Sequence, residues 1–500
     1  MTKPTIKTLG ELKKAGYTSR SIKQELRQNL ITKLKNNQTL FAGVLGYEDT
    51  VIPDVEKAVL ARHNMLLLGL RGQAKTRIAR QMTQLLDEWV PFIAGSDIHD
   101  DPLAPISHFG HNAIAQNGDE TEIDWLHRDE RYVEKLATPD VSVADLIGDV
   151  DPIKAATLKL SYDNERVIHF GLIPRAHRSI FVMNELPDLQ PRIQVALFNI
   201  LQEGDIQIRG FKMRLPLDIE FVFTANPEDY TNRGSIVTPL KDRIESQILT
   251  HYPKNLDLSK EITHQEARIL DEQSDKVHVH PVIADLLEQV SFEARKSEYV
   301  DEKSGVSARL TISAYELLVS ACERRAILNG EDEVHARVGD LVQVIPAITG
   351  KIELVYEGEQ EGPMNVAKLL IGKAIRSVFP AYFPSPETYK KNKSGSPYQE
   401  IVDWFSAGKF IELHHHFTQK EYAEKLVEVP GLYELVKQHH KGADSKEMLI
   451  YMELVLHALA EFSQISKHHV EGGSLTFKDL MSSMFTIDED EYGDDDETIF

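Results

Sequence analysis

The residues whose types and spacing point to chemistry begin with a glycine loop, Gly69-Leu70-Arg71-Gly72-Gln73-Ala74-Lys75-Thr76, followed by Arg77. An apolar run, NMLLLGL, leads into this loop, and a segment with helical apolar spacing, RIARQMTQLLDEW, follows it. Strand, glycine loop and helix in this order are typical of a phosphate-binding loop, in which backbone amides turn toward phosphate oxygens. Lys75 then reaches the outer phosphates and Thr76 ligates Mg²⁺. Ala74 stands where the strict motif has a second glycine.

Two polar residues end a later hydrophobic run, SIFVMNE, and they are Asn184 and Glu185. A carboxylate at a strand end beside the terminal phosphate orients and deprotonates water, and we assign that role to Glu185. Most phosphate-loop ATPases carry Asp where this chain has Asn184, which keeps an acceptor oxygen and loses the charge that helps to hold hydrated Mg²⁺. The sequence leaves two outcomes open, turnover through Glu185 or nucleotide binding with little hydrolysis.

Three more residues fit the same site. The run IEFVFTAN places Asn226 at the end of another strand, where its amide can position water. The alternative is that Asn226 simply begins an ordinary Asn-Pro turn. Arg243 lies in TPLKDRIESQI, just before the last strand, where its guanidinium could reach the nucleotide of a neighbouring subunit. The alternative is a surface salt bridge to Asp242 or Glu245. Arg309 opens a helix after GVSA and is a candidate contact to bound phosphate.

The elements that position these residues predict an α/β fold. From Leu45 to about Tyr252, near-continuous apolar runs alternate with helical patterns, which indicates a mostly parallel sheet that includes NMLLLGL, WVPFIAG, SIFVMNE, IEFVFTAN and SQILTHYP. Helical patterns follow, interrupted by the polar break EGEQEGP. We therefore divide the chain into a basic helical N-terminal arm (1–40), an α/β nucleotide-binding domain (41–255), a helical lid (256–356), a helical C-terminal domain (357–486) and an acidic, disordered tail (487–500).

Composition narrows the function classes. The 500 residues exceed what one core usually serves, and 78 acidic against 56 basic residues give a net charge of −22, which disfavours nucleic acid. Nine Lys or Arg lie within residues 1–40, where we expect a solvated arm, with docking on an acidic neighbour as the alternative. No apolar run approaches about 18 residues, so we expect no membrane span and a cytoplasmic location. Cys322, the only cysteine, has the spacing of a buried helix face.

This order of motifs resembles the AAA+ family over roughly residues 40–355, and within it the MoxR group and the small ATPase subunit of magnesium chelatase. LGYEDTV is similar to the segment that lies over adenine, which adds Leu45 and Gly46 to the nucleotide site. Ala before the loop lysine is frequent in MoxR proteins, so Ala74 fits. DVSVADLIGDVDPIKA and HFGLIPRAHRSIFVMNE resemble the helix-2 insertion.

The stretch from Pro187 to Phe221 resembles a helix and then the β-hairpin before sensor 1. Ile206 and Ile208 alternate on one side of Gly210, and Met213 and Leu215 on the other, which independently favours two strands. Residues 95–135 exceed a minimal AAA+ core, and the sequence assigns them no role.

The resemblance implies ATP and Mg²⁺ as cofactors. It implies an ATPase that forms hexameric rings and works with a von Willebrand factor A domain protein on a third, client protein, often to insert a metal or mature a complex. The implied roles are the P-loop pair for Lys75 and Thr76, the Walker B glutamate for Glu185, sensor 1 for Asn226, the arginine finger for Arg243 and sensor 2 for Arg309. Asn184 departs from the family's Asp.

Competing functions remain beside a chaperone-like remodelling ATPase. One is a nucleotide-gated regulatory scaffold, and another is a magnesium-chelatase-like metal insertion subunit. A sigma-factor activator is disfavoured, because the sequence has neither a GAFTGA loop nor a basic C-terminal helix-turn-helix. The histidine groups 414–416, 439–440 and 468–469 are interpreted as surface or packing residues, since none has the spacing of a structural zinc site.

Overall fold

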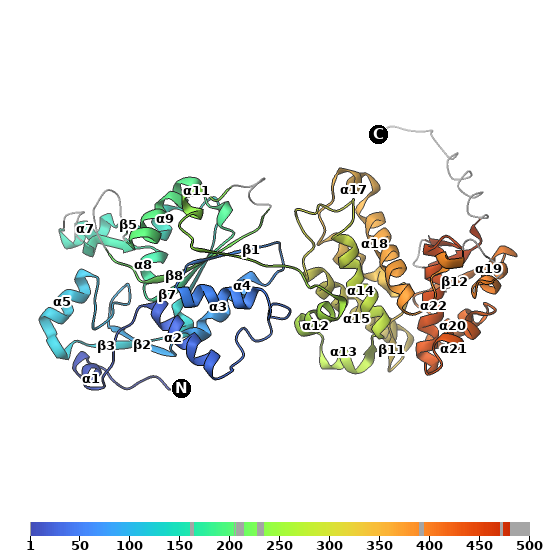
Figure 1. Cartoon of the computed structure of the whole chain (residues 1–500), viewed down its shortest axis with the longest axis horizontal. Coiled ribbons are helices and arrows are strands. Elements are labelled where there is room, and N and C mark those ends of the chain that lie inside the picture. The colour runs from blue at the N-terminus through green and yellow to red at the C-terminus, as the bar shows by residue number, and fades with distance from the viewer. Residues whose placement is uncertain are drawn as a thin grey trace. The chain divides into compact units, whose positions relative to one another are not determined.

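The computed structural model describes residues 2–160, 165–204, 206, 215–227, 235–389, 395–470 and 474–480. The chain divides into two compact units, Met1–Tyr252 and Pro253–Phe500 (Figure 1). Most of the expected hairpin, residues 207–214, and the whole expected acidic tail lie outside the described residues. Within the described ranges, none of the helices combines the length and apolarity that a bilayer crossing requires.

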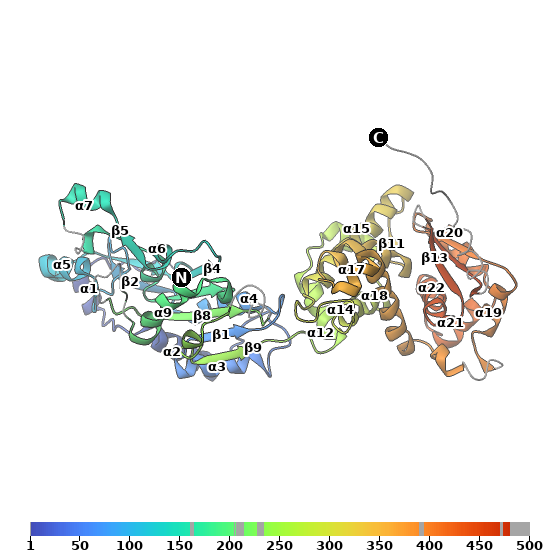
Figure 2. The same ribbon diagram turned by 90° about the horizontal axis from the view of Figure 1, so that it is seen from above.

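A five-stranded sheet with parallel pairing throughout forms the centre of the N-terminal unit. Figure 2 shows three of its strands, β8, β1 and β9, side by side. The expected α/β fold class, a parallel sheet followed by a mainly helical region, is confirmed. The strands in spatial order are β4 (Tyr132–Leu136), β7 (Ser179–Asn184), β8 (Ile219–Ala225), β1 (Met65–Leu68) and β9 (Ser246–Leu249).

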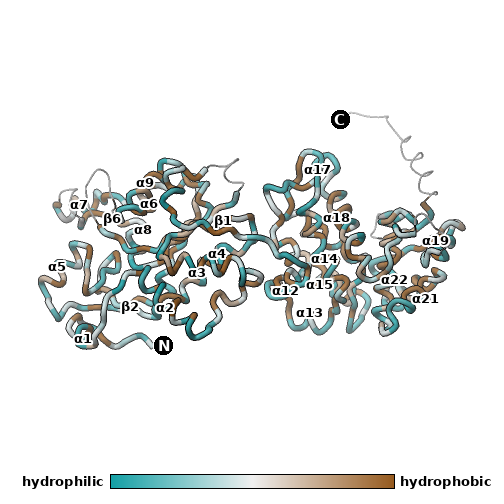
Figure 3. The backbone as a smooth tube through the Cα atoms, viewed as in Figure 1, coloured by the Kyte–Doolittle hydropathy of each residue, from teal (hydrophilic) through white to brown (hydrophobic). Residues whose placement is uncertain are grey.

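The central strands are buried on both faces, which explains their continuous hydrophobic sequences. Met65 and Leu67 of β1 pack into one buried cluster, whereas Leu66 between them packs into another. The same alternation divides β7. Hydrophobic colour follows these strands in Figure 3. The first cluster is covered by α2 (Ile22–Lys35), α3 (Val51–Ala61) and α4 (Lys75–Gln81), and the second by α9 (Pro191–Glu203).

One expected strand of this sheet is wrong. WVPFIAG forms β2 (Trp89–Ile93), which pairs antiparallel with β3 (Ile123–His127) in a separate two-stranded ladder. The fifth strand of the parallel sheet is β4, and its sequence YVEKL gives no strand signal. As an edge strand β4 is only half-buried, so it lacks the apolar run by which the inner strands were found.

The basic N-terminal segment packs onto this unit. Ile22, Leu26 and Leu30 of α2 lie on one helical face and are buried in the same cluster as Met65 and Leu67 of β1. Glu25 on that helix is also buried and forms a bidentate ion pair with Arg131, in which both N···O distances are 2.7 Å. Residues 1–40 were expected to form a solvated helical arm. In the structure, helix α2 of this segment instead packs in the hydrophobic cluster on one face of the sheet.

The second unit is mainly helical and has one hydrophobic core. Its buried cluster runs from Val277 to Phe477, across the expected boundary at 356–357. Helix α18 (Pro363–Val378) packs against both α14 (Pro281–Ala294) and α22 (Ser445–Glu461), which joins the two expected domains. EGEQEGP, expected as a break, lies largely within a short helix, α17. The helices are α12 (Leu256–Glu266), α13 (Asp271–Lys276), α14 (Pro281–Ala294), α15 (Arg309–Asn329), α16 (Ile345–Thr349), α17 (Tyr356–Glu361), α18 (Pro363–Val378), α19 (Gln399–Ser406), α20 (Gln419–Val427), α21 (Leu432–His439) and α22 (Ser445–Glu461).

This unit also contains strands that the sequence did not predict. A three-stranded antiparallel sheet has the order β12 (Ile411–His414), β14 (Ser474–Lys478) and β13 (Ser466–Val470). A parallel pair joins β10 (Val277–His278) to β11 (Val334–His335). Both are too short to give a clear period-2 signal. Cys322 on α15 is buried, as expected, and its burial raises the pKa of its thiol.

The remaining elements of the N-terminal unit are short and lie mostly between the strands of its sheet. They are α1 (Leu9–Lys14), α5 (His108–Asn117), α6 (Val143–Leu146), β5 (Gly148–Val150), α7 (Pro152–Leu158), β6 (Ile168–Phe170), α8 (Leu172–Arg175) and α11 (Thr238–Lys241). Two of them, β5 and β6, pair antiparallel within the segment that resembles the helix-2 insertion.

The buried pair between Glu25 and Arg131 gives a stability prediction. Glu25→Gln leaves the Arg131 guanidinium buried without its counter-charge, so we expect the free energy of unfolding of the N-terminal unit to fall by about 3–5 kcal/mol. Denaturant titration measures it. The control is Asp119→Asn at the exposed pair with Lys13, which should change stability by less than about 1 kcal/mol. Equal, small effects of both substitutions would contradict the anchoring role.

Candidate nucleotide site

The glycine loop connects β1 to α4 in a tight path. Gly72 and Ala74 both have left-handed backbone conformations, with φ of 74° and 54°. For a residue with a Cβ this conformation costs about 1–2 kcal/mol, and such strain is found mainly at functional loops. A Cβ at Gly69 would collide with Thr250 Oγ1 and Gln73 Oε1, so a larger residue there would have to displace both side chains. The loop conformation is therefore held against local strain.

Lys75 points back into this loop rather than to solvent. It is buried, and its ammonium donates hydrogen bonds to the carbonyl oxygens of Gly69 and of Leu70, the latter at 3.0 Å. It also donates to Asn226 Oδ1 at 2.7 Å. Because β1 and β8 are parallel neighbours, their carboxyl ends bring Lys75 and Asn226 together. The structure thus joins two of the residues that the sequence predicted for the site.

Glu185 extends the same network. Asn226 Nδ2 donates to Glu185 Oε2 at 2.9 Å, so the amide bridges the ammonium and the carboxylate. Glu185 follows β7 with a left-handed φ of 53°, and its backbone amide donates to Thr224 Oγ1 at 3.2 Å. A non-glycine residue held in this conformation at a strand end is characteristic of a functional position. Lys75, Asn226 and Glu185 form one continuous polar chain.

A second polar chain lies at the next strand ends. Asn184 Oδ1 lies 3.5 Å from Thr76 Oγ1 and accepts a hydrogen bond from Thr224 Oγ1 at 3.1 Å. On its other side, Asn184 Nδ2 donates to Glu134 Oε1 at 2.6 Å. Glu134 lies on β4, the edge strand, so a carboxylate of the neighbouring strand lies beside the uncharged Asn184. Nothing in the sequence around Glu134 predicts this position.

Glu134 is held by further partners. Arg80 on α4 contacts its other oxygen at 2.9 Å, and the Tyr132 hydroxyl donates to that oxygen at 3.1 Å. Burial, together with the charge of Glu134, raises the pKa of Tyr132. The hydrogen bond to Glu134 raises the pKa of Arg80. The donor set of Thr76, Asn184 and Glu134 consists of hard oxygens, which fits Mg²⁺ and its bound waters.

The segment before α3 is also tied to the loop. The Tyr47 hydroxyl lies 3.1 Å from the backbone oxygen of Gln73 and 2.8 Å from that of His251. Burial raises the pKa of Tyr47 to about 12. Leu45 and Gly46 immediately precede Tyr47 in the chain, and Tyr47 is the residue that contacts the loop.

A second tyrosine contacts the loop, because the Tyr252 hydroxyl donates to the backbone oxygen of Arg71 at 3.1 Å. The glycine loop is therefore held by tyrosine hydroxyls at two of its residues, Arg71 and Gln73. Arg77, on the first turn of α4, is half-buried.

The two remaining predicted residues are arginines, one in each unit. Arg243 donates to Gln202 Oε1 at 3.0 Å and to the Pro239 carbonyl at 2.7 Å, and its guanidinium lies 5.0 Å from the Phe198 ring centre. Within its own chain it therefore contacts α9 and the start of α11 rather than Lys75. Arg309 is exposed on the first turn of α15, in the second unit.

The arrangement has a defined chemical capacity. An ammonium, an amide, a carboxylate and a set of hard oxygen donors meet where the parallel strands β1, β8, β7 and β4 end. Ligands of open parallel sheets bind at these carboxyl ends. The cluster has the groups needed to bind a polyphosphate, hold a hydrated divalent cation and orient water.

No protein-family model matches the chain. Among solved structures it is similar to NtrX from Brucella abortus, with 13% identity over 58% of this chain and a TM-score of 0.34. That match spans 55% of the NtrX chain. NtrX in complex with ATP matches with 14% identity, 70% coverage of this chain, 66% of that one and a TM-score of 0.39.

A complex between the BchI and BchD subunits of magnesium chelatase is also similar, with 18% identity over 64% of this chain and 98% of the matched chain, at a TM-score of 0.33. Magnesium chelatase is among the groups that the sequence resembles. All of these TM-scores lie below 0.5, so the chemistry of the site rests on the side chains described above.

The strained loop gives a second prediction. Ala74→Val places a β-branched residue at a left-handed position, so we expect the free energy of unfolding to fall by about 1–2 kcal/mol. Ala74→Gly relieves the same strain but makes the unfolded chain freer, so we expect a change within about 0.5 kcal/mol of zero. Equilibrium unfolding of both variants measures the difference. Equal stabilities would show that Ala74 does not have this conformation.

Proposed function

We propose that this chain is an AAA+ ATPase that binds and hydrolyses Mg-ATP. The observation that carries the proposal is the contact of Lys75 with Asn226 and, through it, with Glu185, at adjacent strand ends beside a strained glycine loop. A purely structural hydrogen-bond network does not account for both the bent glycine loop and the left-handed backbone of Glu185. A polyphosphate site accounts for both, because the loop amides, the ammonium and a base act on the same ligand.

The proposed roles follow from the contacts. Lys75 leaves the loop carbonyls and binds the outer phosphate oxygens. Glu185 orients a water molecule and takes its proton as the water oxygen bonds to the terminal phosphorus, while the bond to the bridging oxygen breaks and ADP leaves. Asn226 holds Glu185 and contacts the terminal phosphate. Leu45 and Gly46 lie near the base, by resemblance to the AAA+ family.

Mg²⁺ neutralises charge on the outer phosphates when it is bound. Thr76, Asn184 and Glu134 are the residues that would hold it and its waters. In this proposal Glu134 provides the negative charge that Asp provides in other phosphate-loop ATPases. This favours ATP hydrolysis over a nucleotide that is bound without being hydrolysed. Asn184 nevertheless supports a second candidate, a nucleotide-gated scaffold with little hydrolysis.

The assembly is proposed from the resemblance. Arg243 is available to act as an arginine finger toward a neighbouring subunit, because its described contacts lie away from Lys75. Arg309 is proposed to contact nucleotide from the helical unit. A hexameric ring of the MoxR type, remodelling or maturing a client protein together with a von Willebrand factor A domain partner, fits these assignments. A magnesium-chelatase-like metal insertion subunit is the alternative within the same group.

The direct test is ATP binding and steady-state hydrolysis by wild type, Lys75→Ala and Glu185→Gln, across a protein dilution series. Lys75→Ala should weaken ATP binding roughly 10- to 100-fold, since it removes a charged hydrogen bond worth about 1.5–3 kcal/mol. Glu185→Gln should keep ATP binding and lose roughly 10²- to 10⁴-fold in turnover. Lys57→Ala, at an exposed pair with Asp54, is the control and should leave both unchanged.

Dilution separates the candidates. Specific activity that falls on dilution and is lost in Arg243→Ala supports hydrolysis at subunit interfaces. Tight ATP binding by wild type without turnover at any concentration would support the scaffold instead. Unchanged ATP affinity in Lys75→Ala would contradict the nucleotide site itself.

Glu134 gives a further prediction, which concerns the metal. Glu134→Gln removes the charge beside Asn184, so we expect the Mg²⁺ concentration for half-maximal hydrolysis to rise about tenfold, which corresponds to about 1.4 kcal/mol. Adding Asn184→Asp to this variant moves the charge by one strand and should restore the wild-type requirement. Glu130→Gln, exposed next to β4, is the control. If the Mg²⁺ requirement of Glu134→Gln equals that of wild type, Glu134 does not serve the metal.

A further inference from the structure

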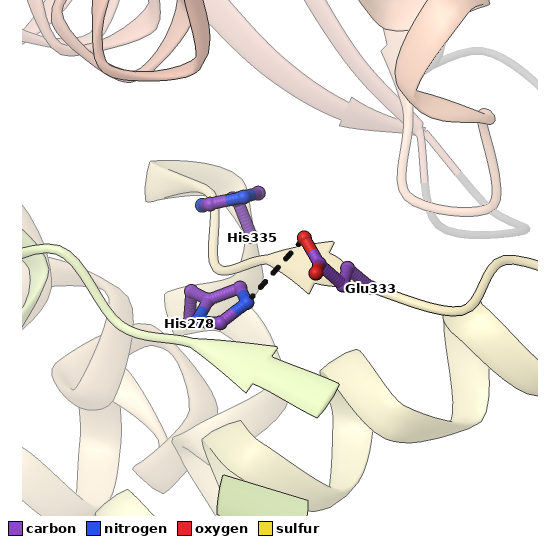
Figure 4. A group of neighbouring side chains, drawn as sticks. All are labelled: His278, Glu333 and His335. Atoms are coloured by element: carbon purple, nitrogen blue, oxygen red, sulfur yellow. Dashed lines mark ion pairs between the residues drawn. The ribbon is translucent and has the colours of Figure 1, made fainter. Parts of the chain in front are cut away.

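Three side chains of types that can ligate a metal converge in the second unit, and none of them was assigned a role above. Strands β10 and β11 pair in parallel with His278 directly opposite His335, and the two imidazole centres are 4.9 Å apart. Glu333 immediately precedes β11, and its Oε2 lies 3.7 Å from His278 Nε2 (Figure 4). One ligand atom from each of the three lies within 4.8 Å of the others.

The backbone that carries the two histidines is anchored to the core of the unit. The carbonyl oxygen of His335 accepts a hydrogen bond from Arg325 at 2.8 Å, and Arg325 is itself buried in an ion pair with Asp340. Val277 and Val334, beside the two histidines, are buried in the core of the unit. The histidine Cα positions are therefore fixed by packing and by a buried ion pair, as metal sites require of their supporting residues.

One imidazole atom is left unsatisfied. His335 Nε2 is buried and has no hydrogen-bond partner among the residues that the structure describes. Buried polar atoms of side chains are nearly always hydrogen-bonded or bound to an ion, and each exception calls for an explanation. An imidazole nitrogen beside a second imidazole and a carboxylate is explained if it serves a metal.

We propose that His278, Glu333 and His335 bind a divalent transition metal ion, with Zn²⁺ as the best fit. Two imidazoles and one carboxylate are the ligand types that Zn²⁺ prefers, whereas Mg²⁺ and Ca²⁺ prefer oxygen ligands alone. Three protein ligands leave a fourth position for water. This site is therefore chemically distinct from the oxygen-rich site proposed for Mg²⁺.

The present spacing needs only a small adjustment. Tetrahedral Zn²⁺ with bonds of about 2.0–2.1 Å places its ligand atoms about 3.3 Å apart. The side chains of His278 and Glu333 are 42% and 58% exposed, so both are free to move inward by the necessary 1 Å or so while His335 stays fixed. The metal would link β10 to β11. It would thereby also link the start of α14, which follows β10, to the end of α15, which precedes β11.

Lys446 is a built-in competitor of the metal. Its ammonium lies 3.2 Å from Glu333 Oε2, and its side chain is 43% exposed. A metal ion and this ammonium compete for the same carboxylate by charge repulsion. Removing Lys446 should therefore strengthen metal binding, an effect that a merely structural histidine pair does not produce.

The test is calorimetric titration of Zn²⁺ into the chelator-treated full-length protein, in excess Mg²⁺ and without nucleotide, with Co²⁺ absorption as a report on coordination. We expect one site whose affinity falls at least about tenfold in His278→Gln and in His335→Gln and rises severalfold in Lys446→Met. His416→Ala, at the exposed end of the histidine tract 414–416, is the control and should bind as wild type does. Circular dichroism checks that each variant folds.

The outcomes are decisive for this site alone. Unchanged Zn²⁺ affinity in both histidine variants would overturn the proposal, because the ion would then bind elsewhere. Weaker binding in Lys446→Met would overturn it too. Since the titration contains no ATP, its result is independent of whether the nucleotide site proves correct.

Discussion

The N-terminal unit is organised around a buried ammonium group. Lys75 is enclosed by the loop that it belongs to and donates to Asn226 on the neighbouring strand. A buried charge is costly unless acceptors surround it, so the loop path and the β1–β8 pairing must form together. Helices α2, α3 and α4 bury one face of these strands, which keeps their carboxyl ends in register. The reactive groups are positioned by packing that lies well away from them.

Strand order turns separate sequence motifs into one site. Moving outward from β1, the sheet continues through β8, β7 and β4, and each of these strands contributes a polar residue at or near its end. These residues are Asn226, then Asn184 with Glu185, and then Glu134. Hydrogen bonds connect them in two chains that both reach the start of α4. The carboxylate of Glu134 on β4 thereby lies beside the uncharged Asn184 on β7.

Much of this was visible in the sequence because buried parallel strands read as continuous apolar runs. Four of the five sheet strands and the polar residues that follow three of them were predicted. Strand β4 was not, since an edge strand is half-buried and YVEKL has no apolar run. Glu134 was missed for the same reason, because its role depends on which strand lies beside β7. The short strands of the second unit gave no periodic signal, and the single core there depends on contacts between distant helices.

In the proposed function, Lys75 changes its hydrogen-bond partners when nucleotide binds. The most direct measurement is a structure of the full-length protein with Mg²⁺ and a non-hydrolysable ATP analogue. We expect the ammonium of Lys75 to leave the carbonyl oxygens of Gly69 and Leu70 for outer phosphate oxygens, with Glu134 and Asn184 facing the metal and its waters. A nucleotide bound elsewhere, or a Lys75 that keeps its present contacts beside bound nucleotide, would contradict the account.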